Sequence, residues 1–346
     1  MRRICLLAFY LAAVFGGGAL LAPWLYHLTQ WEVGHWTALA GLARNPFPRF
    51  VLRAILGLAV AGLWPLLRGC GMWSRREMGL AFGAEQKAES RNWEMEDKDK
   101  SRLDGGFHPR RAYGGQAPYP GGWLFGGRPG GNLAAGFAIG FGSLAGVAGL
   151  AVVCGGRALH LPHSGLEMVG ILLGATASAA VVAVVEELIF RGALFGILRK
   201  TWEWPAALAV SSAVYASVHF LQKAGAPQSI DWLSGIRLLP ELFRIPPEGM
   251  GLAPAFFTLF LAGAILALAY ERTGTLFLSI GLHAGWIFWL TAYRVLTEES
   301  PGASRRIWGS DKLIDGWLAF FVLAVVLAGL WRAGRPASGP DAREKL

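Results

Sequence analysis

Two adjacent carboxylates lie inside an apolar stretch of this sequence. Glu186 and Glu187 follow a long run of mostly apolar residues, and Arg191 comes four positions after Glu187. An acidic residue at the centre of a spanning helix costs about 2.5–3.5 kcal/mol. A chain that keeps two of them at membrane depth therefore has a use for them or a network of partners. His219 and His283 are the other ionisable residues deep within apolar segments.

The spacing of these residues predicts separate roles for the two carboxylates. In a helix, Glu187 and Arg191 share a face and can pair, whereas Glu186 is rotated by about 100° from Glu187. The arginine would hold one carboxylate as an ion, and the other would be able to take a proton. A glutamate with a histidine can act as a general base on water, and a second histidine can stabilise an oxyanion. The set indicates amide hydrolysis without a serine or cysteine nucleophile.

The expected depths of Glu187 and His219 agree, and that of His283 is within reach of them. The segment 166–198 can form one long helix that begins with a capping box of Ser164 and Glu167. At a rise of 1.5 Å per residue, Glu187 and His219 lie about 20 Å and about 21 Å from the short loop between their segments, and His283 lies about 12 Å from the same side. We expect both glutamates and both histidines to converge on one site. Each histidine alone could equally hydrogen-bond a neighbouring helix.

A metal site is the alternative chemistry. Glu186, His219 and His283 form a plausible zinc set, with water in the open coordination position. The sequence contains no His-Glu-x-x-His motif, and these three residues come from three separate segments. The residues alone do not decide between zinc and water activation by glutamate and histidine.

The composition is that of a membrane protein. Hydrophobic residues make up 54% of the chain, charged residues only 16%, and the mean hydropathy is +0.41. Because a spanning helix needs about 20 mostly apolar residues, we predict an all-α, polytopic membrane protein with about eight transmembrane helices. The predicted segments are residues 4–25, 51–67, 133–153, 166–198, 205–220, 254–270, 276–293 and 316–331.

The distribution of charge predicts the orientation. The first segment has an apolar run too long for an ordinary signal peptide, so we expect an uncleaved helix. An N-terminus on the inner side places most Lys and Arg there, which predicts a multi-pass protein of the cell inner membrane with both termini cytoplasmic. Basic inner loops facing anionic lipid account for the net charge of +9. We therefore expect the lipid bilayer as a partner and no nucleic acid.

The polar segments divide the chain. We predict two N-terminal helices in residues 1–68, a six-helix body in residues 132–332 and a polar tail in residues 333–346. Residues 69–131 are predicted to form a disordered cytoplasmic loop, because their charged, Gly- and Pro-rich composition buries too little apolar surface. The loop 221–251 mixes aromatic, apolar and charged residues, which is typical of an interfacial segment.

These residues resemble the CAAX-processing and bacteriocin-processing (CPBP, also called ABI) family of intramembrane proteases. The family motif Glu-Glu-x-x-x-Arg is complete from Glu186 to Arg191, and Phe-x-x-x-His appears as Tyr215-Ala-Ser-Val-His219. The third motif starts at His283 but has Ile287 where the family often has Asn. The resemblance covers about residues 166–293.

The resemblance implies an eight-helix endopeptidase that hydrolyses a peptide bond of a membrane-associated protein or peptide. By motif position, Glu186 and His219 would activate water, Glu187 and Arg191 would support the site, and His283 would hold the oxyanion. It implies a glutamate-type enzyme with no cofactor, with zinc as the alternative.

Ile287 leaves the oxyanion role of the usual Asn unfilled, and Trp286 and Ser279 are the candidate substitutes. This departure favours a second hypothesis, a non-catalytic membrane binding or immunity protein of the same fold. A proton-coupled transporter is a third, because intramembrane Glu, His and Arg also form proton relays. A transporter would be expected to contain inverted repeats or paired broken helices, and we find neither pattern in the sequence.

Overall fold

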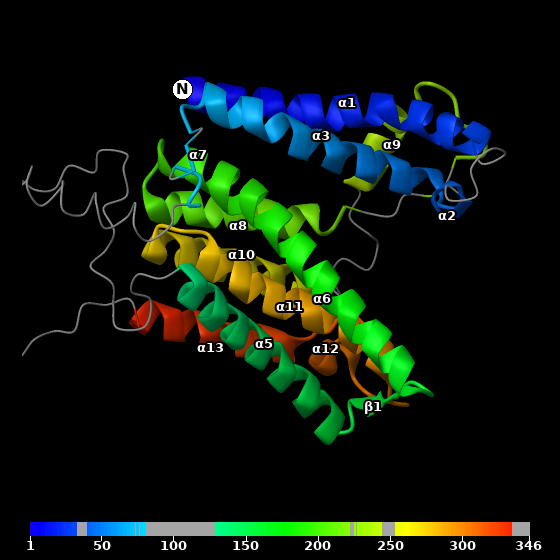
Figure 1. The fold of residues 1–346 in the computed structure, drawn as a ribbon, viewed down its shortest axis with the longest axis vertical. Helices are drawn as coiled ribbons and strands as arrows, with labels where there is room; N and C mark the ends of the chain where they lie inside the picture. The colour runs from blue at the N-terminus through cyan, green and yellow to red at the C-terminus, as the bar shows by residue number, and fades with distance from the viewer. Residues whose placement is uncertain are drawn as a thin grey trace, which may run out of the picture. The chain divides into compact units, whose positions relative to one another are not determined.

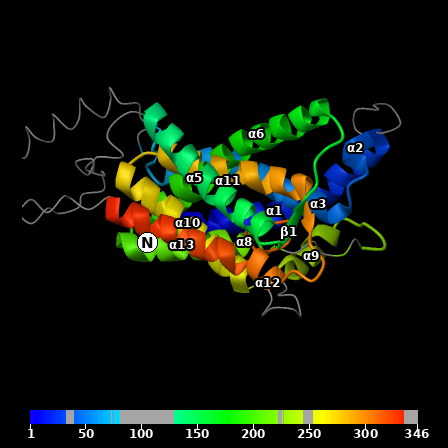
Figure 2. The same cartoon turned by 90° about the horizontal axis from the view of Figure 1, so that it is seen from below.

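The computed structural model describes residues 1–32, 40–72, 74–75, 77–80, 129–221, 225, 227–243 and 253–333. All eight predicted apolar segments are helical, which confirms the all-α class (Figures 1 and 2). The helices are α1 (Arg2–Glu32), α2 (Ala40–Ala43), α3 (Phe47–Gly69), α5 (Pro129–Val153), α6 (Gly165–Glu187), the π-helix η2 (Leu188–Phe195), α7 (Gly196–Arg199), α8 (Trp204–Val218), α9 (Ser234–Leu242), α10 (Ala253–Thr273), α11 (Phe277–Leu296), α12 (Arg305–Trp308) and α13 (Trp317–Ala333).

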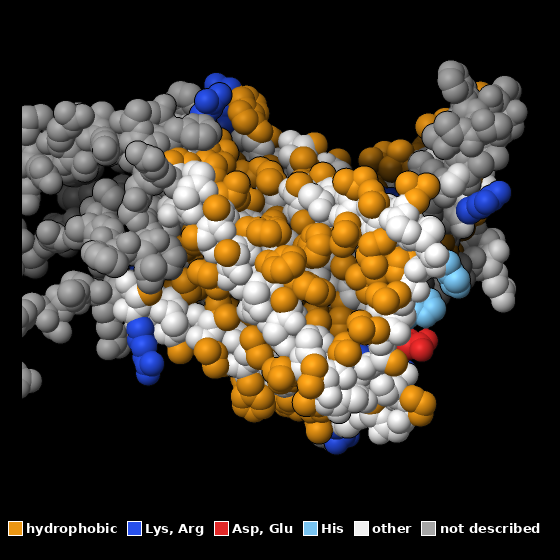
Figure 3. Space-filling view, turned by 60° about the horizontal axis from the view of Figure 1, so that its bottom comes forward, with side chains coloured by type: hydrophobic (Ala, Val, Ile, Leu, Met, Phe, Trp, Pro, Cys, Tyr) orange, Lys and Arg blue, Asp and Glu red, His pale blue; other side chains and the backbone are white. Residues whose placement is uncertain are grey.

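Several of these helices are long and apolar enough to cross a membrane. Among the described residues there are five such helices, namely α1, α3, α5, α10 and the continuous helix Gly165–Arg199. The shorter helices α8 and α13 are also apolar. Hydrophobic side chains cover much of the face shown in Figure 3, and the charged side chains visible there lie toward its margins. The chain is therefore a multi-pass membrane protein.

The chain forms two compact units, and their composition differs from the predicted domains. The first unit contains Met1–Trp73 and Ala216–Met250, and the second contains Ser74–Tyr215 and Gly251–Leu346. By this division, the part 216–250 of the predicted body 132–332 belongs to the same unit as the two N-terminal helices. The reason is an apolar core in which Leu238 and Leu242 of α9 pack with residues of α1 and α3.

In the first unit, α9 lies along α1 and α3. The carbonyl oxygen of Ile230, just before α9, is 3.1 Å from Nε2 of His27 on α1. The backbone of α9 comes so close to α1 at Gly235 that any Cβ there would overlap the backbone of Ala19. The predicted interfacial segment is thus anchored on α1, and its level in the bilayer stays a prediction.

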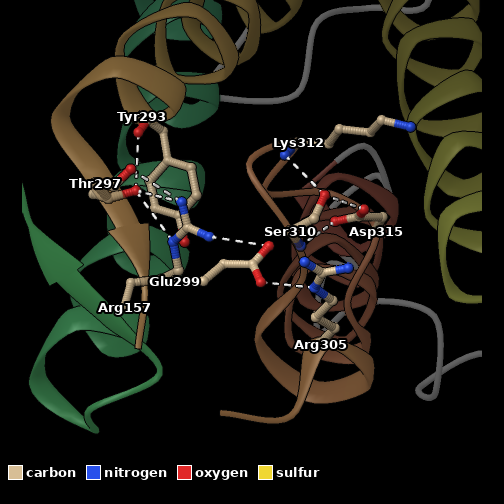
Figure 4. A network of polar contacts seen from close by, with 8 residues as sticks. All are labelled: Arg157, Tyr293, Thr297, Glu299, Arg305, Ser310, Lys312 and Asp315. Atoms are coloured by element: carbon tan, nitrogen blue, oxygen red, sulfur yellow. Dashed lines mark hydrogen bonds and ion pairs between the residues drawn. The ribbon is translucent and has the colours of Figure 1, made fainter. Parts of the chain in front are cut away.

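In the second unit, α11 lies between α5 and α6 (Figure 2), and α10 packs against both α11 and α13. One end of α11 is tied to α5 by a short antiparallel pair of strands, β1 (Arg157–Leu159) and β2 (Thr297–Glu299). Figure 4 shows the polar network there: Arg157 is buried, donates to the carbonyl and hydroxyl oxygens of Thr297, and lies over the ring of Tyr293.

The beginning of the predicted disordered loop contributes to the second unit. The carbonyl oxygen of Gly79 accepts a hydrogen bond from the Leu276 amide, 2.9 Å away, at the turn between α10 and α11. Glu77 forms an ion pair with Lys200, 3.1 Å away. Partial burial tends to raise the pKa of Glu77, but Lys200 and Ser74 hold it below the ordinary value. The predicted loop 69–131 therefore differs from the structure at residues 74–80, because these local bonds offset the ordering entropy. Residues 81–128 and most of the tail 333–346 lie outside the described residues.

The contact of this segment with the second unit can be tested at Gly79, which has a φ of 74°. A Cβ there would lie 2.5 Å from the ring of Tyr270. Gly79→Ala is therefore expected to lower the melting temperature. Gly71→Ala is the matched control, because Gly71 has a φ of 71° but no heavy atom within 4 Å of its Cβ position. Both variants carry the backbone strain of about 1–2 kcal/mol, and only Gly79→Ala adds the overlap. Equal melting temperatures would show that residues 74–80 do not hold the α10–α11 turn.

Candidate functional site

The site is built where α6 passes into a π-helix. The predicted capping box is present at the start of α6: Ser164 Oγ accepts from the Glu167 amide, and Glu167 accepts from the His163 amide. The helix continues to Glu187 and then widens into η2, which contains Arg191. Short π-helical segments are rare and frequently occur at functional sites. The change of helix type therefore falls at the predicted Glu-Glu-x-x-x-Arg motif.

Glu187 is the centre of a buried polar cluster. Its Oε1 accepts a hydrogen bond from Arg191 Nη1 at 2.8 Å and lies 2.9 Å from Nδ1 of His283. Arg191 also donates to the carbonyl oxygen of Gly263 on α10, 3.3 Å away. The predicted Glu187–Arg191 pair is thus present. Since a buried charge without a partner is strongly destabilising, the two charges stabilise each other.

The hydrogen bonds of Glu187 determine the tautomer of His283. A carboxylate ionised by Arg191 can only accept, so Nδ1 of His283 must donate to it. The Nε2 atom of neutral His283 then carries a lone pair. This atom lies 3.7 Å from Oε2 of Glu186 and 3.4 Å from the hydroxyl oxygen of Tyr215. His283 therefore bridges the two carboxylates and presents Nε2 toward Glu186.

The two glutamates differ in exposure as the helix spacing predicted. The side chain of Glu187 is 0% exposed, whereas that of Glu186 is 24% exposed. The Glu186 side chain is thus the more accessible of the two, although its Oε2 is buried. Adjacent residues of the same type thus have one fixed and one accessible carboxylate.

Tyr215 also belongs to this cluster, although the sequence had indicated no role for it. Its hydroxyl is within hydrogen-bond distance of His283, and its ring lies under the Arg191 guanidinium, 4.4 Å from ring centroid to Cζ. Phe190 meets the same ring edge-on at 5.0 Å. The available signal was the second motif, where Tyr stands in place of Phe and adds one hydroxyl group.

The sequence analysis named three further residues, His219, Trp286 and Ser279. His219 follows the end of α8 and belongs to the first unit, so its approach to Glu186 stays a prediction. Trp286 donates through Nε1 to Ser143 Oγ at 3.0 Å, and buried Ser279 donates to the Leu276 carbonyl. Trp286 and Ser279, the candidates for the role of the usual Asn, therefore already donate their protons to other acceptors.

Zinc is the alternative cofactor for this set of residues. Among the described residues, no group of three or more His, Cys, Asp or Glu side chains is arranged to hold a metal. His283 already uses Nδ1 for Glu187, so it offers at most Nε2. None of the steps proposed below involves a metal.

A comparison with protein families adds independent information. Residues 168–289 match the family model Rce1-like, described as Type II CAAX prenyl endopeptidase Rce1-like. This range includes every residue of the cluster, from Glu186 in α6 to His283 in α11. No curated protein and no solved structure matches the chain.

Proposed function

Since residues 168–289 match the family model of the Rce1-like CAAX prenyl endopeptidases, we propose that this membrane protein is an intramembrane endopeptidase that hydrolyses a peptide bond of a membrane-associated protein or peptide. The observation that carries the proposal is the pair of unlike carboxylates on one histidine. Glu187 is buried between Arg191 and His283, and Glu186 lies partly exposed beside the same imidazole.

In the proposed reaction Glu186 is the general base. It takes a proton from a water molecule, whose oxygen attacks the carbonyl carbon of the scissile bond. The tetrahedral intermediate then breaks the C–N bond, and the proton held by Glu186 passes to the leaving amine. His219 is the proposed partner of Glu186 in activating this water. Glu187 and Arg191 support the site by fixing the position of His283.

The oxyanion needs donors near Nε2 of His283. This atom donates only when the imidazole carries a second proton, because Nδ1 already holds the proton of the neutral form. The Tyr215 hydroxyl lies 3.4 Å from Nε2 and can donate at the same place without a change of charge. We therefore assign stabilisation of the oxyanion to His283 and Tyr215. Tyr215 supplies a hydrogen-bond donor that Ile287 cannot supply.

Tyr215→Phe tests this assignment, because it removes one hydroxyl group and keeps the ring beneath Arg191. Loss of one oxyanion donor typically costs about 10²–10³-fold in kcat, and we expect a loss near the lower end because His283 remains. Tyr293→Phe is the matched control, a buried tyrosine on α11 outside the cluster. Equal kcat values for the two variants would remove Tyr215 from the mechanism.

The function is tested with purified protein in detergent and a peptide that ends in a prenylated cysteine followed by three residues. We expect release of the last three residues, with activity that survives a metal chelator. Stoichiometric zinc, with activity lost to the chelator and restored by metal, would contradict the glutamate mechanism. Tight binding of the intact peptide without cleavage would support the membrane binding or immunity protein instead.

We also propose that the protein lies in the cell inner membrane with both termini cytoplasmic, because this orientation places most Lys and Arg inside. A reporter that is active only in the cytoplasm should be active when fused to either terminus. Activity at only one terminus would contradict an even number of spans.

A further inference from the structure

Two pairs of glycines join α5 to α11 directly behind the site. Gly136 and Gly140 lie on α5, and Gly281 and Gly285 lie on α11. A Cβ at Gly281 would overlap the carbonyl oxygen of Leu133, and one at Gly140 would overlap that of Leu282. Small residues four positions apart allow two membrane helices to approach backbone to backbone. The two helices can therefore come this close only because these four positions carry no side chain.

His283 lies midway between the two glycines of α11. Each glycine is two positions away, which places it about 160° around the helix from His283. The glycines face α5, so the histidine faces the opposite side, where α6 packs through a row of residues four apart, namely Ala175, Ala179, Ala183 and Glu187. Helix α5 thus packs on the side of α11 opposite to His283.

A hydrogen bond fixes the position of α11 along α5. Trp286 Nε1 donates to Ser143 Oγ at 3.0 Å, and Ser143 Oγ donates to the Gly140 carbonyl at 2.8 Å. Trp286 is one turn from His283 along α11, so this bond and the glycines act on the same part of the helix.

From this packing we propose that α5 is part of the catalytic apparatus, with Gly136, Gly140, Gly281 and Gly285 as positioning residues for His283. The inference deepens the proposed function and rests on it. It extends the functional region beyond residues 168–289, because α5 precedes that range. In the proposed reaction these residues touch neither substrate nor water, and they act only through the position of the imidazole.

The test is a set of Gly→Ala variants whose kcat, KM and melting temperature are measured. At Gly281 or Gly140 the added Cβ must push the helices apart by about 1 Å, since a C–H···O contact needs a C···O distance of about 3.3–3.6 Å. A displacement of about 1 Å in a catalytic site can cost about 10²-fold in rate. We therefore expect kcat to fall by about 10²-fold while KM changes little.

Gly142→Ala and Gly146→Ala are the matched controls on α5, because a Cβ at either position meets no heavy atom within 4 Å. Both kinds of variant gain the same helix propensity, so only the overlap differs. Wild-type kcat in the controls, with reduced kcat in Gly281→Ala and Gly140→Ala, is the expected result. A kcat equal to the controls in both variants would overturn the proposal.

Trp286→Phe gives a second test that creates no overlap, in case the glycine variants fail to fold. It removes one hydrogen bond between the helices, for which we expect a loss of about two- to tenfold in kcat with KM unchanged. An unchanged kcat in Trp286→Phe, with the glycine variants unfolded, would reduce the glycines to a role in stability and overturn the proposal. Full activity of Glu186→Gln would instead contradict the proposed function, whatever the glycine variants show.

Discussion

Glu186→Gln is expected to lower kcat by about 10²–10⁴-fold, because it removes the general base and keeps the size of the side chain. The melting temperature should stay close to that of the wild type, since Glu186 is exposed by 24% and the buried ion pair belongs to Glu187. Measurement of kcat on the prenylated peptide, together with a thermal melt, separates loss of chemistry from loss of structure.

Glu203→Gln is the control for this experiment. Glu203 is an exposed carboxylate in the loop before α8, so the same substitution there should leave kcat unchanged. If Glu186→Gln and Glu203→Gln both kept wild-type activity, Glu186 would have no catalytic role, and the binding-protein hypothesis would gain support.

Arg191→Ala is expected to lower the free energy of unfolding by about 3–5 kcal/mol, because it leaves Glu187 as a buried charge without its closest partner. The pair is short, 2.8 Å, and its two side chains are 2% and 0% exposed. Activity should fall as well, since Glu187 would no longer hold His283 in place. Thermal or denaturant unfolding in detergent measures the effect on stability.

The pair of Arg305 and Glu299 is the matched control. Its N–O distance is 2.7 Å, but its side chains are 73% and 36% exposed. An exposed ion pair contributes only about 0–1 kcal/mol, so Arg305→Ala should change stability little. A stable but inactive Arg191→Ala would show that Arg191 acts in chemistry or substrate binding, and Glu187 would then lose its structural assignment.

Much of the site could be predicted from local patterns in the sequence. Apolar segments long enough to span a bilayer gave the helices, because lipid requires every backbone group to be paired within the segment. The spacing of four residues identified the partner of Glu187, since such residues share a helix face. The rise per residue placed His283 within reach of the glutamates. Each of these inferences depends on geometry within one segment.

The features that the sequence did not reveal depend on contacts between segments. Helix α9 packs on α1 through Gly235, and nothing in the loop composition names that partner. Gly79 accepts a backbone hydrogen bond from the α10–α11 turn, and Glu77 forms an ion pair with Lys200 at the end of α7. Tyr215 gained its role only from its contact with His283 on α11. No sequence signal marked the glycines on the α5 side of α11, because only their backbone contacts distinguish them from the many other glycines of the chain.

The most direct test of the central claim is product analysis by mass spectrometry in water enriched in oxygen-18. Purified wild type and Glu186→Gln are incubated with the same prenylated peptide under single-turnover conditions. We expect wild type to cut one peptide bond and place one oxygen-18 atom in the new carboxylate, and Glu186→Gln to leave the peptide intact. An intact peptide with folded wild type, or equal cleavage by both proteins, would contradict hydrolysis by Glu186-activated water.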